Sequence, residues 1–340
     1  MQDRAGFAEF VRSLPKAELH VHIEGTLEPD LMLALAERNH QPLPYPDVSA
    51  ARAAYRFADL QSFLDLYYRG ANVLQTEQDF YDLTWAYVTR AAQEGIRHIE
   101  PFFDPQTHVQ RGVPFGLVIA GILHALGDAE EDFGITSKLI MCFLRDLSVE
   151  DAEHTLATAH LYQSRIAGVG LDSAEIGNPP EKFEKVFDQA GAYGLHRVAH
   201  AGEEGPASYI TGALDVLNVE RIDHGVRCLD DPVLVQRLVD ERIPLTVCPL
   251  SNVKLRVFES LASHPLRRMM DAGLLVTVNS DDPAYFGGYL SDNYLAVAEA
   301  LDLSPLDMVT LARNSFEASF ADEKRKATCL AEIDAFLATR

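Results

Sequence analysis

Two histidines separated by one residue near the N-terminus are the first side chains with a clear chemical use. They are His20 and His22, in the stretch ELHVH. Because side chains alternate along a β-strand, both imidazoles are expected on one face of a strand. Two imidazoles on one face can share a metal ion, although H-x-H pairs also occur as ordinary polar residues of a sheet. The pair therefore predicts a metal site only if further ligands come from elsewhere in the chain.

Three more candidate ligands each follow a β-rich run. They are His200 in VAHAGEE, His224 in RIDHG and Asp281 in VNSDDP. In a (β/α)₈ barrel the C-terminal ends of all strands converge on one mouth, so residues distant in sequence meet there. Imidazoles with a carboxylate form a ligand set suited to Zn²⁺, with a position left for water. Each residue could instead be an isolated cap or turn residue, but their shared placement at strand ends favours a metal site.

The elements that must position these side chains follow a regular alternation. Short β-rich runs alternate with segments of helical period, which is typical of βα units around a parallel sheet. We predict eight strands, at residues 17–22, 96–103, 138–144, 168–172, 197–201, 221–224, 245–249 and 275–280. Outer helices are predicted at residues 77–94, 115–132, 150–164 and 180–193. The expected fold class is α/β, a (β/α)₈ TIM barrel.

A helical insertion is the largest departure from this alternation. After the first strand, residues 27–39 and 59–70 each have a helical pattern, and the proline-rich residues 41–47 between them are expected to form a loop. The segment from residue 292 onward is helical by pattern and is expected on the barrel exterior. No internal repeat or linker-like change of composition occurs, so we expect residues 1–340 to form a single metal-dependent hydrolase domain.

Composition limits the classes of partner and the compartment. The formal net charge of the 340 residues is -22, which disfavours nucleic acid and anionic membrane surfaces and is compatible with a small neutral substrate. The four cysteines lie far apart, without a C-x-x-C pair, which argues against disulfides and a cysteine zinc site. With no signal-like or membrane-spanning apolar stretch, we expect a cytoplasmic protein. Whether it forms a homo-oligomer stays open.

Four motifs of the chain resemble those of a known family. LHVHIEGTLEP, HAGEE, RIDHG and SDDP are similar to the motifs of the adenosine and adenine deaminase branch of the amidohydrolase superfamily, and they occur in family order from Leu14 to about Phe286. The resemblance implies one zinc ion per chain. It also implies the roles of individual residues: zinc ligation by His20, His22, His200 and Asp281, proton shuttling by Glu203, orientation of the metal-bound water by His224, and binding of purine N7 by Asp282.

The implied reaction explains these residue types. Zinc lowers the pKa of a bound water to about 7, which supplies the nucleophile. The aromatic C6 of the purine accepts this oxygen only if N1 gains a proton, which a protonated Glu203 can donate. By the same resemblance Asp281 takes the water proton, and His224 can hydrogen-bond the oxygen on which charge develops. The deaminases that act on bases within nucleic acid carry a different signature, H-x-E with P-C-x-x-C, which this sequence lacks.

The fourth-strand motif bears on the choice between base and nucleoside. Family members that act on the nucleoside usually have a glycine two residues beyond L-D-x, where this chain has Glu175. A carboxylate there could accept a hydrogen bond from the N–H on N9 or N3, which only the free base has. We therefore expect adenine to be converted to hypoxanthine and ammonia, and we expect Glu175 and Asp282 to bind the purine. Glu175 could instead be a rim residue in a loop.

Two other interpretations stay open at this point. One is a related chemistry, namely deamination of adenosine or of N6-substituted adenines. The other is an inactive barrel that serves as a purine-binding protein, although all the metal and acid-base residues are present. Separately, an apolar stripe in residues 59–70 has the spacing of an ordinary core helix, and by resemblance to the family it would line the pocket as a lid. The stripe comprises Leu60, Phe63, Leu64 and Tyr67.

Overall fold

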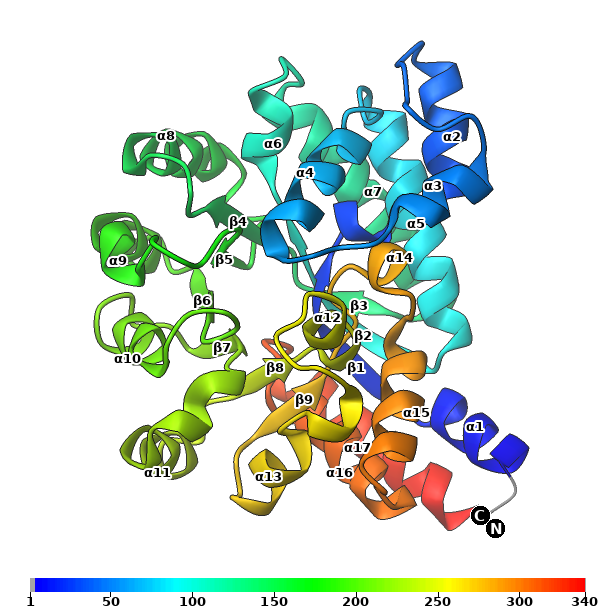
Figure 1. The fold of residues 1–340 in the computed structure, drawn as a ribbon, viewed down its shortest axis with the longest axis vertical. Coiled ribbons are helices and arrows are strands. Elements are labelled where there is room, and N and C mark those ends of the chain that lie inside the picture. Colours follow the sequence, from blue (N-terminus) through cyan, green and yellow to red (C-terminus); the bar gives the residue numbers. More distant parts are fainter. Residues whose placement is uncertain (1–3, 340) are drawn as a thin grey trace.

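A parallel β-barrel surrounded by helices is the main feature of the computed structural model, which describes residues 4–339 (Figure 1). The strand order is β1-β2-β4-β5-β6-β7-β8-β9, all neighbours are parallel, and a short β3 pairs beside β2. The strands are β1 Lys16–His22, β2 Ile96–Phe103, β3 Thr136–Ser137, β4 Ile140–Leu144, β5 Gly168–Asp172, β6 His196–Ala201, β7 Arg221–His224, β8 Leu245–Val247 and β9 Val276–Val278. The predicted (β/α)₈ barrel is thereby confirmed.

The barrel closes between the first strand and the segment that follows the last one. Val21 and Asp281 form a parallel bridge. The His22 N–H donates to the Asp281 carbonyl at 3.0 Å, and the Asp281 N–H donates to the His20 carbonyl at 3.1 Å. The side chain of Glu18 lies at the same seam, where its Oε1 accepts a hydrogen bond from the Ser280 N–H at 3.1 Å. Residues from the two ends of the barrel sequence therefore complete both the sheet and its C-terminal mouth.

Helices cover the outside of the barrel and the region around its mouth. The outer layer contains α5 Glu77–Gln93, α7 Phe115–Phe133, α8 Val149–Ala159, α9 Glu184–Ala192, α10 Ala207–Asp215, α11 Pro232–Asp240, α13 Leu266–Asp271 and α16 Pro305–Glu317 (Figure 1). The insertion after β1 contributes α2 Pro29–Arg38, α3 Val48–Ala54 and α4 Leu60–Ala71. The remaining helices are α1 Arg4–Ser13, α6 Pro105–Val109, α12 Pro249–Lys254, α14 Pro283–Phe286, α15 Leu290–Ala300 and α17 Glu323–Ala338. The rings of Phe10 and Phe336 are 5.4 Å apart, so α1 and α17 are neighbours.

Most predicted elements are confirmed, with shorter strands near the mouth. The predicted runs 245–249 and 275–280 contract to Leu245–Val247 and Val276–Val278 because the chain leaves the sheet there and turns into the site. Several elements were not predicted, namely α1, α6, α10, α11, α12, α13 and α14, together with two whose absence from the prediction has a clear reason. One is β3, which has only two residues. The other is α3, an alanine-rich turn capped by Asp47, whose side chain accepts a hydrogen bond from the Ala50 N–H at 2.8 Å.

The barrel interior is polar at the level of the site, where an aromatic ring packs against the first two histidines. Leu19 and Val21 of β1 join the large apolar cluster, while His20 and His22 face inward with Phe102. The ring of Phe102 lies 5.0 Å from that of His20 and 5.1 Å from that of His22. The alternation predicted for this strand therefore places both imidazoles against the apolar ring of Phe102. In this buried position each polar atom of the imidazoles needs a hydrogen-bond or metal partner.

Candidate active site

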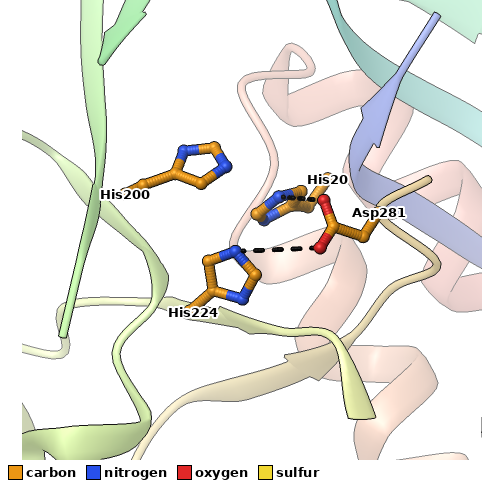
Figure 2. A group of neighbouring side chains, drawn as sticks. All are labelled: His20, His200, His224 and Asp281. Atoms are coloured by element: carbon orange, nitrogen blue, oxygen red, sulfur yellow. Dashed lines mark hydrogen bonds and ion pairs between the residues drawn. The ribbon is translucent and has the colours of Figure 1, made fainter. Parts of the chain in front are cut away.

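Three imidazoles and a carboxylate meet at the barrel mouth, as Figure 2 shows. His20 comes from β1, His200 from β6 and His224 from the end of β7, and Asp281 follows β9. The His20 Nε2 is 3.1 Å from the Asp281 Oδ1, and the His224 Nε2 is 3.8 Å from the Asp281 Oδ2. His22 joins the group, with its Nε2 3.3 Å from the His200 Nε2 and 3.5 Å from the Asp281 Oδ1. All five side chains are buried.

The protonation states of these groups are those of metal ligands. Burial lowers the pKa of His22 to about 4, that of His224 to about 3, and that of His200 well below 6.5. Burial alone would raise the pKa of Asp281, but the neighbouring imidazoles outweigh it and lower that pKa well below 3.8. Neutral imidazoles and an ionised carboxylate, with ring nitrogens facing one another at 3.3 Å, fit a shared divalent cation.

A hydrogen-bonded chain behind the imidazoles fixes their orientation. The Thr246 hydroxyl donates its proton to the Asp223 Oδ1 at 2.9 Å, so at 2.9 Å it must accept from the His20 Nδ1. In the neutral tautomer that this chain selects, the Nδ1 carries the ring proton and the Nε2 lone pair faces the shared centre. Asp223 also reaches the His200 Nδ1, at 3.6 Å. Such outer partners set the tautomer and ring orientation of metal-ligating histidines. Neither Thr246 nor Asp223 was predicted, although Asp223 lies inside the RIDHG motif.

Unfavourable backbone conformations gather at the same strand ends. His224 has φ of 63°, Asp281 of 66°, and Ser173, directly after β5, of 69°. Gly202, directly after β6, has φ of 69°. A non-glycine residue held in this region costs of order 1–3 kcal/mol and is found mainly where the surrounding structure imposes it. Here the imposed conformation turns the side chains of Ser173, His224 and Asp281 into the mouth.

Glu203 lies beside this group in a form suited to donate a proton. Burial and the charge of Asp281 raise the pKa of Glu203 well above 4.5. Its Oε2 is 3.5 Å from the His224 Nε2, and the Asn252 amide donates to its Oε1 at 3.2 Å. His264 is buried and contacts the Asn252 Oδ1 at 3.2 Å. Asn252 was not predicted, because nothing in its sequence neighbourhood marks it as a site residue.

Asp282 also faces the cavity, held against the backbone of the first motif. A Cβ atom on Gly25 would lie 2.0 Å from the Asp282 Oδ1, so only glycine allows this close approach. Burial and the charge of Asp281 raise the pKa of Asp282 well above 3.8. No group among residues 4–339 hydrogen-bonds to its Oδ1. A carboxyl group in this form can donate or accept a hydrogen bond to a ligand.

Helix α4 covers the cavity. Its Leu60, Phe63, Leu64 and Tyr67 pack together with aromatic residues of α14, so the apolar stripe is both core and cavity wall. The ring of Phe63 is 4.7 Å from that of Phe286. The cavity is lined by His22, Leu60, Phe63, Leu64, Tyr67, Tyr68, Asp104, Asp172, Ser173, His200, Glu203, His224, Leu255, Asp281 and Asp282.

Glu175 occupies a different place from the expected one. It is buried and is not among the residues that line the cavity. Its Oε1 accepts a hydrogen bond from the Gly202 N–H at 2.6 Å. Its Oε2 accepts from the N–H groups of Glu203, Glu204 and Gly205 at 3.1, 3.0 and 2.8 Å. The carboxylate therefore holds the turn that carries Glu203, and it is neither a rim residue nor in contact with the cavity.

A family profile described as adenosine deaminase matches residues 15–336. The chain belongs to the adenosine deaminase family. A relative from Cupriavidus necator, named adenine deaminase, is 61% identical over 332 residues, which are 98% of this chain and 95% of that protein.

Two solved structures have the same architecture. A crystal structure of adenine deaminase from Arthrobacter aurescens is 56% identical, with a TM-score of 0.94 over 96% of this chain and 99% of that one. An amidohydrolase from Burkholderia ambifaria, solved with bound Zn, is 28% identical, with a TM-score of 0.91 over 100% of this chain and 96% of that one. Within residues 4–339, no helix is both long and apolar enough to cross a membrane.

Proposed function

We propose that this chain is a zinc-dependent hydrolase that converts adenine and water to hypoxanthine and ammonia. The observation that carries the proposal is the buried His/Asp group with Glu203 beside it, 3.5 Å from His224, inside a covered cavity. Burial and the charge of Asp281 raise the pKa of Glu203 well above 4.5, which favours its acid form. The names of the Cupriavidus and Arthrobacter relatives support adenine as the substrate. The bound Zn of the Burkholderia relative supports zinc as the metal.

In this proposal His20, His22, His200 and Asp281 hold one zinc ion per chain. When bound there, zinc supplies the nucleophile by lowering the pKa of a water molecule to about 7. The ionised Asp281 accepts the proton that this water releases. His224, with its Nε2 3.8 Å from the Asp281 Oδ2, hydrogen-bonds the attacking oxygen as charge develops on it.

The purine is bound and activated by two carboxyl groups that lie beside the His/Asp group, those of Glu203 and Asp282. Glu203 delivers its proton to N1 while C6 becomes tetrahedral, which makes addition to the aromatic ring possible. Asp282 hydrogen-bonds N7 and thereby fixes the plane of the base. As the tetrahedral carbon collapses, Asp281 returns its proton to the leaving amine, which departs as ammonia, and the hydroxyl proton passes to Glu203 as the carbonyl of hypoxanthine forms. The apolar wall from α4 excludes bulk water, which strengthens each of these interactions.

A substrate panel combined with metal analysis tests this proposal. Ammonia release is measured with adenine, adenosine and N6-methyladenine on protein purified without chelator. We expect the highest kcat/KM with adenine and about one zinc ion per chain. A preference for adenosine would make the chain a nucleoside deaminase. No turnover of any purine, together with purine binding, would identify an inactive barrel.

A further inference from the structure

Asp104 is a buried carboxyl group in the cavity wall that the proposed reaction does not use. It follows β2 and is 3% exposed. It precedes α6, but its side chain makes no capping hydrogen bond to that helix. The Tyr67 hydroxyl donates to its Oδ2 at 3.4 Å, and no group among residues 4–339 hydrogen-bonds to its Oδ1. An oxygen of Asp104 also lies within 4.8 Å of an oxygen of Asp172 and of a ring nitrogen of His22, so the two carboxyl groups can share a proton. The contacts with Tyr67 and Asp172 still leave the carboxyl group of Asp104 able to accept a hydrogen bond from a ligand.

The surroundings make this residue costly for the fold. Burial and the charges of Asp172 and Glu24 raise the pKa of Asp104 well above 3.8, and Asp282 adds to the effect. Glu24 is already occupied, because it accepts hydrogen bonds from the Asp104 N–H at 3.1 Å and pairs with the His108 Nε2 at 2.7 Å. A buried polar atom without a partner opposes folding, and sequences keep such atoms mainly where they serve function.

The other carboxyl groups that line the cavity already have partners or roles. Asp281 belongs to the proposed set of metal ligands, Glu203 is proposed to protonate N1, and Asp282 is proposed to hydrogen-bond N7. Asp172 stands 3.6 Å from the His22 Nδ1, where it can orient that imidazole. Asp104 is thus the one lining carboxyl group without an assignment, and the N3/N9 edge of the base is the part of the purine without a partner.

We propose that Asp104 accepts a hydrogen bond from the N9–H of the free base and thereby selects against N9-substituted purines. The inference rests on the proposed function, because it assumes that N7 faces Asp282. N7 and N9 belong to the same five-membered ring, and Asp282 and Asp104 both line the cavity, close enough for the charge of Asp282 to raise the pKa of Asp104. A carboxyl oxygen can accept this N–H whether or not the group is ionised. A nucleoside has no such hydrogen and carries its sugar at this position.

Two variants and a matched pair of substrates test the role of Asp104. Adenine is compared with 9-methyladenine, which keeps the ring but lacks the N9–H. D104A should lower kcat/KM for adenine roughly 10- to 100-fold, the range expected when a hydrogen bond to a charged or buried group is lost. Its kcat/KM for 9-methyladenine should hold steady or rise. D104N keeps a carbonyl acceptor, so it should retain more of the parent's preference for adenine than D104A does.

Controls separate recognition from folding and from general loosening of the cavity. L60A opens the apolar wall without changing Asp104, and it should lower kcat/KM for adenine and for 9-methyladenine by the same factor. Because D104A removes an unpaired buried carboxyl group, its Tm should equal or exceed that of the parent. The inference is overturned if D104A lowers kcat/KM equally for adenine and 9-methyladenine, or if D104N loses as much of the preference for adenine as D104A does. It is also overturned if L60A changes the ratio of the two kcat/KM values as much as D104A, or if the Tm of D104A falls below that of the parent. A parent that prefers adenosine would instead refute the proposed function.

Discussion

The backbone N–H of Glu203 donates a hydrogen bond to the side chain of Glu175 at 3.1 Å. The N–H groups of Gly202, Glu204 and Gly205 converge on the same carboxylate. A run of backbone N–H groups around an anion forms a nest, which fixes the conformation of the turn. At Gly205 an added Cβ would lie 2.6 Å from the Glu175 Oε1, so the nest also requires a glycine there. Glu175 thereby sets the place from which Glu203 meets the substrate.

We expect variants of Glu175 to impair turnover without changing selectivity. In E175Q one acceptor oxygen becomes an NH₂ group that faces backbone N–H donors, so the turn loosens and kcat should fall about 10- to 100-fold. The ratio of kcat/KM for adenine to that for adenosine should stay the same, because Glu175 does not line the cavity. E184Q, on the exposed face of α9, serves as the control. Increased adenosine turnover in E175G would instead support the purine contact suggested by the sequence.

Glu203 and Glu204 form a matched pair for the proton-transfer step. E203Q should lower kcat by about 10²–10⁴-fold or more, because an amide cannot deliver a proton to N1. Metal content and Tm should stay unchanged. E204Q removes a half-buried carboxyl group one residue away that does not line the cavity, and it should keep kcat within a few fold of the parent. Equal losses in the two variants would remove Glu203 from its role.

The metal content of variants distinguishes the roles of His200 and His224 at the barrel mouth. H200A removes a ligand whose Nε2 faces that of His22, so we expect it to lose the metal and all activity. H224A should lose activity and retain about one metal ion per chain, because His224 is assigned to the attacking oxygen. Elemental analysis of both proteins, with a chelated and zinc-reconstituted parent for reference, gives the answer. Metal loss in H224A would make His224 a ligand.

The close approach between Gly25 and Asp282 gives a steric test of N7 recognition. In G25A the new methyl group would lie 2.0 Å from the Asp282 Oδ1 and 2.8 Å from its Cα, so that side chain must move. We expect KM for adenine to rise about 10-fold or more, since such overpacking typically costs 1–3 kcal/mol. G127A, in α7 with no described atom within 4 Å of the new Cβ, should leave KM unchanged and stabilise the fold by about 0.5–1 kcal/mol. An unchanged KM in G25A would exclude Asp282 from purine binding.

The sequence predicted those features that depend on strand alternation and on barrel convergence. His20, His200 and Asp281 could be placed together because each ends or follows a strand, and all strand ends share one mouth. The partners of Glu175 could not be predicted, because they depend on the left-handed backbone at Ser173 and Gly202. That conformation turns the chain after two neighbouring strands and leaves no periodic signal. Asp104 was missed for a related reason, since a carboxyl group before a proline and a helix has the pattern of an ordinary cap.

The seam between β1 and the segment after β9 sets the order in which the protein can be completed. His20 and Asp281 are 261 positions apart, and β1 leaves the ribosome long before its closing partner is made. Until then one edge of β1 is unpaired, and the histidines already synthesised lack their carboxylate. Closing so long a loop costs little extra entropy, because the cost grows by only about 0.6 kcal/mol for each doubling of length. The order of synthesis is therefore the constraint. The site can bind zinc with high affinity only after residue 281 has been synthesised, and a chain that stops before this residue cannot form the site.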